Sequence, residues 1–236
     1  MFILIPTKLI SFFKRVLPFL SIKCLACFFI GISYSLFLSP EDYKQGEVVR
    51  IMYLHVPSAW LSLGIYSLIA FFSFISLVWN NACASILARA AAPTGIVFSA
   101  VCLITGSIWG KGTWGAWWVW DARLTTMLIL FFLYSGYILL WSFFDNKARA
   151  EKSSALFAIF SAINIPIVKF SVDLWATLHQ PASILRRGGI AIESSILLPL
   201  IIMLLFFTIF FLITWILNFF YFINSYRIKR EISMRY

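Results

Sequence analysis

Long, nearly uninterrupted apolar runs dominate the chain and predict six membrane-spanning helices. A membrane core about 30 Å thick takes about 20 apolar residues per helix, and each run reaches that length. The runs are continuous and do not alternate with period two, which argues against a transmembrane β-barrel. The fifth run is the weakest, because it includes Asn164 and Pro166. The expected spans are residues 19–38, 56–79, 90–108, 124–144, 154–172 and 196–222.

The composition agrees with this pattern and excludes a soluble domain. Hydrophobic residues make up 62% of the 236 positions and charged residues only 12%, whereas soluble domains average roughly half and a quarter. Six spans and their loops use up the chain, so we expect one all-α, polytopic membrane domain over residues 1–236 with no separate catalytic domain. The four cysteines, including Cys24 and Cys27 in one apolar run, are expected to be inert membrane residues.

The basic residues lie between the spans and predict the orientation of the chain. The net charge of +10 could suggest nucleic acid, but its distribution fits the rule that Lys and Arg remain on the cytoplasmic side. Both termini are therefore expected in the cytoplasm, with outer loops at 39–55, 109–123 and 169–195. The residues expected on the cytoplasmic side are Lys8, Lys14, Arg15, Lys23, Arg89, Lys147, Arg149, Lys152, Arg227, Lys229, Arg230 and Arg235.

The middle outer loop is rich in tryptophan and glycine. Five of the ten tryptophans of the chain lie between residues 109 and 120, interleaved with Gly110, Gly112 and Gly115. Interfacial anchoring explains scattered tryptophans but not this density in one loop. Indole rings offer flat apolar faces and one N–H each, and glycine lets the backbone approach a ligand. The segment thus favours a planar apolar ligand with a polar rim. Its tryptophans are Trp109, Trp114, Trp117, Trp118 and Trp120.

The only two histidines of the chain, His55 and His179, both fall in the outer segments. Each precedes a proline by two positions, in the sequences His-Val-Pro and His-Gln-Pro. Proline favours extended backbone before it, so we expect both histidines at the edge of a helix, facing the outer surface. Neutral imidazole is a common ligand of haem iron. A tetrahedral zinc site is disfavoured, because no third histidine and no outer cysteine is available.

Charged residues beside the tryptophans are further candidates. Asp121 could be the N-cap of the fourth span as well as a site residue. Arg123 and Lys111 could mark the membrane interface or bind carboxylates, and Arg186 and Arg187 are weaker candidates for the same role.

The segment 109–125 resembles the tryptophan-rich WWD domain of haem-handling membrane proteins. Six spans, a short chain and one histidine in each flanking outer loop make the sequence similar to the haem exporter protein C (CcmC) family of cytochrome c maturation. The resemblance implies that haem b is ligated by His55 and His179. It also implies a haem platform formed by the five tryptophans with Asp121 and Arg123. Implied partners are the haem chaperone CcmE, the ABC transporter subunits CcmA and CcmB, and the one-span subunit CcmD.

The resulting expectation is a protein that holds haem at the outer face of the membrane and delivers it to the chaperone, without being an enzyme. A bacterial inner membrane with the site facing the periplasm is favoured, and a mitochondrial inner membrane is the alternative. A permease that moves haem or another solute through the helix bundle remains a second hypothesis. A purely structural subunit is a third, although it would need neither the histidines nor the tryptophans.

Overall fold

The computed structural model describes residues 7–179, 189 and 192–233, and it confirms a helical protein with six spans. The spans are long and apolar enough to cross a membrane, and the fifth is built from two helices. The described ranges contain α1 (Thr7–Ser33), η1 (Tyr34–Leu38), η2 (Glu47–Ile51), α2 (Met52–Trp79), α3 (Ala82–Trp114), α4 (Ala122–Phe143), α5 (Lys147–Ser161), α6 (Asn164–Leu174) and α7 (Ser194–Ser233).

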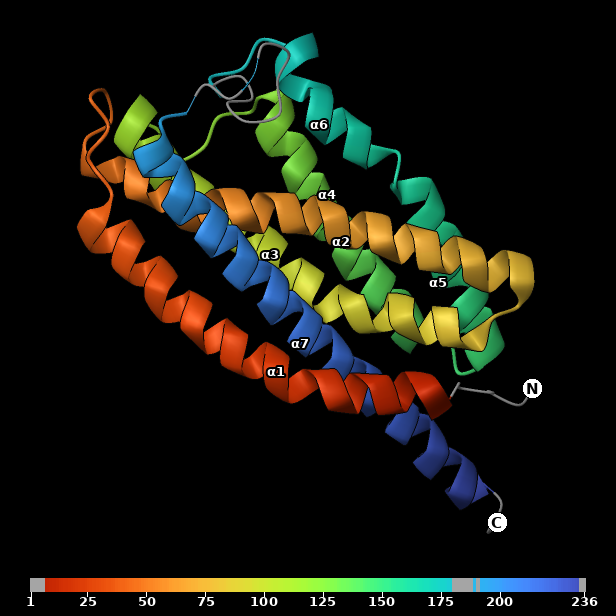
Figure 1. Cartoon of the computed structure of the whole chain (residues 1–236). Helices are drawn as coiled ribbons and strands as arrows, with labels where there is room; N and C mark the ends of the chain where they lie inside the picture. The colour runs from red at the N-terminus through yellow and green to blue at the C-terminus, as the bar shows by residue number, and fades with distance from the viewer. Residues whose placement is uncertain (1–6, 180–188, 190–191, 234–236) are drawn as a thin grey trace.

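Tight polar caps make the turns at one end of the bundle. Asn80 ends α2 in the left-handed conformation, with φ of 47°, and the side chain of Asn81 caps α3 by accepting from two backbone N–H groups. Asn146 caps α5 in the same way. Asparagine suits both roles, because its amide oxygen accepts locally and it tolerates positive φ. The longer connections lie at the opposite end of the bundle (Figure 1).

The first residue of α1 and the last turn of α7 lie at the end with the short turns (Figure 1). An even number of spans brings both ends of the chain to one side. The segments 39–51, 115–121 and 175–179 lie at the other end, where the outer loops were expected.

The fifth span is interrupted where its sequence is weakest. α5 ends at Ser161 and α6 begins at Asn164. Pro166 lies in the first turn of α6, where its missing N–H removes no intrahelical bond. The side-chain amide of Asn164 donates to the backbone oxygen of Thr126 at 3.0 Å, which ties the break to α4.

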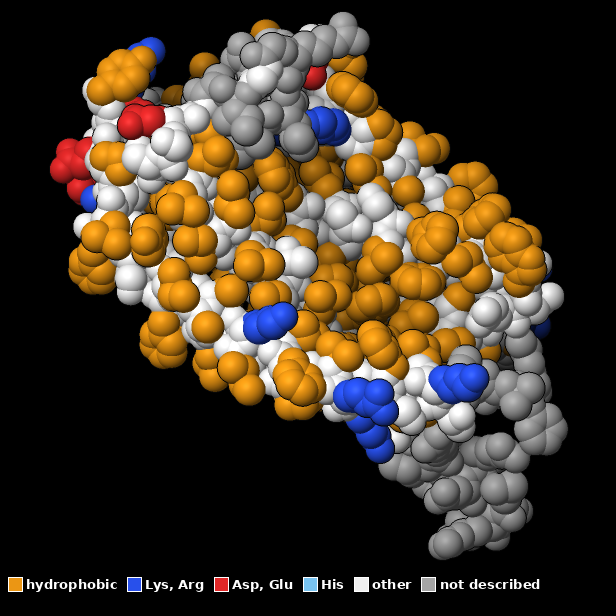
Figure 2. Space-filling model, in the orientation of Figure 1, with side chains coloured by type: hydrophobic (Ala, Val, Ile, Leu, Met, Phe, Trp, Pro, Cys, Tyr) orange, Lys and Arg blue, Asp and Glu red, His pale blue; other side chains and the backbone are white. Residues whose placement is uncertain are grey.

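The main core is formed by α2, α3, α4 and α7, with smaller contributions from α5 and α6. Tyr66 and Tyr134 pack edge to face with ring centroids 4.9 Å apart, and the Tyr134 hydroxyl donates to the backbone oxygen of Ser62 at 2.6 Å. α3 is the most buried span and α1 the least. α1 lies at one edge of the bundle along α7 (Figure 1). Apolar side chains cover most of the side of the bundle shown in Figure 2, as a lipid-facing surface requires.

Three helices are clearly longer than the sequence predicted, and α7 continues to Ser233 instead of ending near residue 222. α1 begins at Thr7 and not near residue 19, and α3 runs from Ala82 to Trp114. The hydrophobic pattern located the membrane core, but a helix continues past that core until a cap ends it. As a result Lys23, expected in a cytoplasmic segment, lies in the middle of α1. Residues 109–114 of the expected loop 109–125 are helical, and only 115–121 are irregular.

Candidate functional site

His55 lies near the start of α2, packed against the last turns of α3. A Cβ atom on Gly106 would approach the His55 ring to 2.9 Å, so only glycine fits at that point of α3. Nδ1 of His55 lies 3.0 Å from the backbone oxygen of Cys102 and 3.1 Å from Oγ1 of Thr105. A carbonyl oxygen only accepts, so Nδ1 holds the proton, and the lone pair of Nε2 is left for a ligand.

The prediction of an extended backbone at His55 is wrong. η2 continues directly into α2 at Met52, and His55 is helical. Pro57 is buried within α2, together with Tyr53 and Ser58. Pro57 lacks a backbone N–H, but near the start of the helix this removes at most one intrahelical hydrogen bond. Burial of Tyr53, Pro57 and Ser58 stabilises the helical conformation here.

His179 lies opposite His55, in the irregular segment that follows α6. The two imidazole centroids are 6.5 Å apart, with ring planes 37° from parallel. Nδ1 of His179 is buried and has no hydrogen-bond partner among the described residues. Burial, with a smaller effect of the Arg123 guanidinium, lowers the pKa of His179 to about 4. The imidazole is therefore neutral at pH 7, as a metal ligand must be.

A chain of hydrogen bonds joins His179 to the start of α4. Asp121 is the N-cap predicted from the sequence, since its Oδ1 accepts from the backbone N–H of Leu124 at 2.8 Å. Its other oxygen, Oδ2, accepts from the hydroxyl of Thr177. The Thr177 hydroxyl in turn accepts from the backbone N–H of His179 at 3.1 Å. Asp121 is only 9% exposed, so this link is largely shielded from water.

Two of the tryptophans pack directly against the histidines. Trp109 lies edge to face with His55 at 5.5 Å between centroids, and Trp114 lies edge to face with His179 at 5.1 Å. Nε1 of Trp109 donates to Oε1 of Gln45 at 2.7 Å, which fixes the ring from the first outer segment.

The other tryptophans lie in the irregular part of the segment. Trp118 and Trp120 pack edge to face at 5.5 Å, and Nε1 of Trp118 is buried without a partner among the described residues. The side chains of Trp117 and Trp120 are 60% and 76% exposed. The segment thus presents flat apolar faces that the described part of the chain leaves largely uncovered.

Gly112 and Gly115 are each favoured for a different structural reason. Gly115 ends α3 with φ of 78°, a conformation that favours glycine. Gly112 lies against Val48, and a Cβ there would come within 2.8 Å of that side chain. These contacts bring the first outer segment onto the end of α3.

The basic side chains near the site differ in whether they make hydrogen bonds within the protein. The ammonium of Lys111 donates to the backbone oxygen of Gly115 at 3.0 Å, so it caps α3. Arg123 is half-buried beside the histidines, and its guanidinium has no hydrogen bond or ion pair with any other described residue. Arg186 and Arg187 lie outside the described residues.

Four further residues contact the site, although the sequence analysis did not single them out: Gln45, Cys102, Thr105 and Thr177. Thr177 could have been found from a weak local signal, since the hydroxyl of a Ser or Thr often accepts a hydrogen bond from the backbone N–H two residues later. Cys102 contributes a backbone oxygen, which no side-chain pattern reveals.

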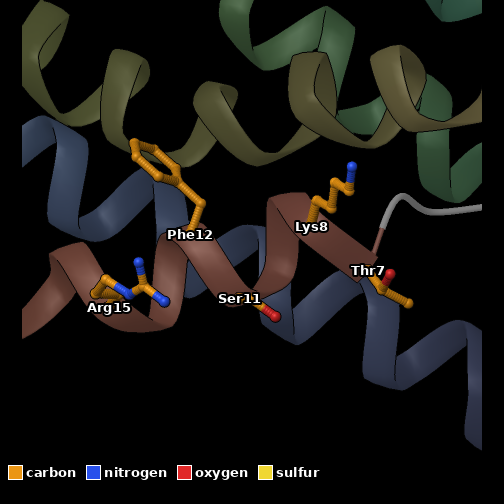
Figure 3. Close-up of a pocket in the computed structure, with 5 residues that line it drawn as sticks. All are labelled: Thr7, Lys8, Ser11, Phe12 and Arg15. Carbon is orange, nitrogen blue, oxygen red and sulfur yellow. The ribbon is translucent and has the colours of Figure 1, made fainter.

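A separate hollow of about 310 Å³ lies at the other end of the molecule, on the first turns of α1 (Figure 3). It is lined by Thr7, Lys8, Ser11, Phe12 and Arg15. It is far from both histidines along the bundle, so it is not part of the candidate site.

Comparison with known proteins identifies the family of this chain. A sequence profile of the family described as "Heme exporter protein C" (CcmC) matches residues 2–234. The chain is similar to "Heme exporter protein C" of Bradyrhizobium diazoefficiens, with 46% identity over 87% of this chain and 78% of the relative. It is 42% identical to the protein of that name from Escherichia coli K12, over 78% of this chain and 75% of the relative. A "putative cytochrome c biosynthesis ccmC-like mitochondrial protein" of Marchantia polymorpha is 43% identical over 79% of each chain. The chain therefore belongs to the heme exporter protein C family.

Proposed function

We propose that this protein binds haem at the outer face of the membrane and delivers it to a haem chaperone for the maturation of c-type cytochromes. Membership of the heme exporter family supports the general role. The observation that favours this site is the pairing of the only two histidines of the chain, with ring centroids 6.5 Å apart.

The residues present fit a haem group. Two imidazoles on opposite sides of one metal ion have centroids roughly 6 Å apart, since each metal–nitrogen bond is about 2 Å. The unpaired Nδ1 of His179 and the free Nε2 of His55 leave a nitrogen on each ring without a protein partner. Within the described ranges no three His, Cys, Asp or Glu side chains could together hold a metal ion. Two histidines suit an iron whose other four ligands come from a macrocycle.

The protein's own residues bind and orient the group. Trp109 and Trp114 hold the imidazoles in place, and the exposed faces of Trp117 and Trp120 offer area to a porphyrin. Arg123 is placed to pair with a propionate in fork geometry. Haem itself supplies the reactive vinyl groups and the iron, while the residues of this chain bind it and exclude water. On this proposal the protein is not an enzyme.

The orientation and partners form part of the same proposal. The excess of Lys and Arg at the end with the short turns supports cytoplasmic termini. The histidines would then face the periplasm of a bacterium, or the equivalent side of a mitochondrial inner membrane. The partners are the chaperone CcmE, the transporter subunits CcmA and CcmB, and the small subunit CcmD. The chain functions as one membrane domain over residues 1–236, in which the segment 109–125 forms the haem platform.

Haem titration of the purified protein tests the proposal. We expect a sharp Soret band at one haem per chain, distinct from the spectrum of haem in empty detergent micelles. Adding the soluble domain of the chaperone should move haem to that domain. A spectrum identical to that of haem in micelles would contradict the proposal. Binding without transfer would contradict the delivery step and leave the binding step standing.

The rival permease role predicts a different result. It requires transport of haem across proteoliposomes by this chain alone, and a route lined by polar or ionisable groups. Intramembrane Lys23 is exposed on the outside of the bundle and lines no such route.

A further inference from the structure

Lys23 lies on an exposed, otherwise apolar stripe of α1. Its side chain is exposed, and the residues beside it on the same face follow helical spacings of three and four. Phe19 is 63% exposed and Ile22 69%. We call this stripe the Lys23 face; it consists of Phe19, Ile22, Lys23, Ala26, Phe29 and Ile30.

The packing of α1 on α7 fixes the depth of Lys23. The two helices are antiparallel: Phe28 packs on Phe206 at 5.2 Å between centroids, and Phe13 packs on Phe219 at 5.4 Å. By interpolation Lys23 is level with about residue 210 of α7. That position is the middle of the 33-residue span Ser194–Tyr226, which contains no charged residue. Lys23 therefore lies near the middle of the membrane.

The ammonium of Lys23 cannot reach water or a counter-ion within this chain. The next basic residue towards the cytoplasm, Arg15, is eight residues away, or about 12 Å along the helix. A lysine side chain extends only about 6 Å when it snorkels. None of the nine acidic residues lies within 1–40 or 194–226. The side chain of Lys23 has no ion pair or hydrogen bond with another described residue. A lone cation at this depth is unfavourable, and such residues usually have a partner.

We propose that the Lys23 face is the docking surface for a membrane-spanning helix of a different protein, which presents an Asp or Glu at the depth of Lys23. Charge complementarity selects the chemistry of the partner. A second copy using the same face would bring two lysines together, so the partner is a different chain. Lipid headgroups lie at the interface and not at this depth. Ala26, one turn from Lys23, leaves room for close approach of a helix backbone.

The surroundings of α1 agree with a missing neighbour. Only 11% of its most apolar stretch is buried, against 28% to 61% in the other five spans. Within this chain it packs mainly on α7 and stands at the edge of the bundle, with the apolar outer face open (Figures 1 and 2).

Photo-crosslinking in native membranes tests the proposal. A photoreactive amino acid replaces Ile22 in the full-length protein, and the matched control replaces Leu139 of α4, which is 66% exposed. After illumination, mass spectrometry identifies the attached peptide. We expect the Ile22 probe to join a membrane-spanning segment of another protein that contains an Asp or Glu, and the Leu139 probe not to join that segment.

Variants of Lys23 distinguish the charge from mere proximity. Lys23→Met should lower the yield of this adduct by about three- to tenfold, as expected for loss of one interhelical polar contact, and Lys23→Arg should retain it. Adducts confined to phospholipid or to another copy of this chain would overturn the proposal. So would a segment without a carboxylate, or an adduct whose yield Lys23→Met leaves unchanged. Haem spectra do not enter these readouts, so the result is independent of the proposed function.

Discussion

Replacing Thr177 by valine removes the link between Asp121 and His179 while keeping the shape of the side chain. The hydroxyl of Thr177 donates to Oδ2 of Asp121 and accepts from the backbone N–H of His179. Valine can do neither. The carboxylate keeps its other contact, the helix cap at Leu124, so α4 should still form. The expected defect is therefore a loosely held His179 in a folded protein.

The size of the effect follows from the burial of the groups involved. A hydrogen bond to a charged group contributes about 1.5–3 kcal/mol. We use the lower end, since Thr177 is only half-buried and water can partly replace its hydroxyl. A loss of about 1.5 kcal/mol corresponds to about tenfold, and we expect haem affinity to fall by that factor. Part of the bound haem should also become high-spin, because the His179 ligand is less often in place.

Haem titration and the visible spectrum measure both effects. Thr177→Ser keeps the hydroxyl and should stay within about threefold of the parent protein. Thr208→Val on α7 is a matched control, because it also removes one half-buried threonine hydroxyl, which donates to the backbone of Leu204 far from the site. Parental affinity and parental spin state in Thr177→Val would refute the idea that this link positions His179.

Three further predictions concern the haem platform, the cation beside it and the orientation. Replacing Trp118 and Trp120 together by Ala should weaken haem retention, at roughly 1 kcal/mol or more per indole face. The double Phe variant should be milder, and full haem loading of the Ala pair would reduce these residues to interfacial anchors. Arg123→Gln should weaken haem binding by about tenfold through loss of a propionate contact. Arg123→Lys should recover part of it, and equal affinities for dimethyl-esterified haem in all three proteins would identify the propionate as the group recognised. Reporter fusions should show cytoplasmic exposure at Arg15, Lys147 and Arg230, and the opposite at Gly46, Gly112 and Gly188; opposite sides for Gly112 and Gly188 would contradict a shared site.

The sequence was sufficient to predict the number of spans, because a continuous apolar run of about 20 residues matches the thickness of the membrane core. It located helix ends poorly. The spans end at caps such as Asn80, Asn81 and Asp121, whereas the hydrophobic pattern ends where the membrane core ends. For this reason Lys23, which lies near a predicted helix end, was predicted on the cytoplasmic side. The contacts between α1 and α7 indicate instead that it lies near the middle of the membrane.

The candidate site was partly predictable for a similar reason. Two histidines in a chain of 236 residues, both in outer segments beside clustered tryptophans, are conspicuous in the sequence. Their supports are not. The proton on Nδ1 of His55 is fixed by a backbone oxygen 47 residues away, and Asp121 reaches Thr177 across 56 residues. Such contacts depend on how helices pack, which local sequence patterns do not encode.

The spin state of bound haem tests the central claim, ligation of one iron by His55 and His179, most directly. The parent protein should give a six-coordinate, low-spin spectrum. His55→Ala and His179→Ala should each shift it towards high spin, and added imidazole should restore the low-spin form by filling the vacated position. Trp60→Ala, a change away from the site, should have no effect. A parental spectrum in both histidine variants would contradict the claim and leave the two imidazoles as ordinary polar residues of the outer surface.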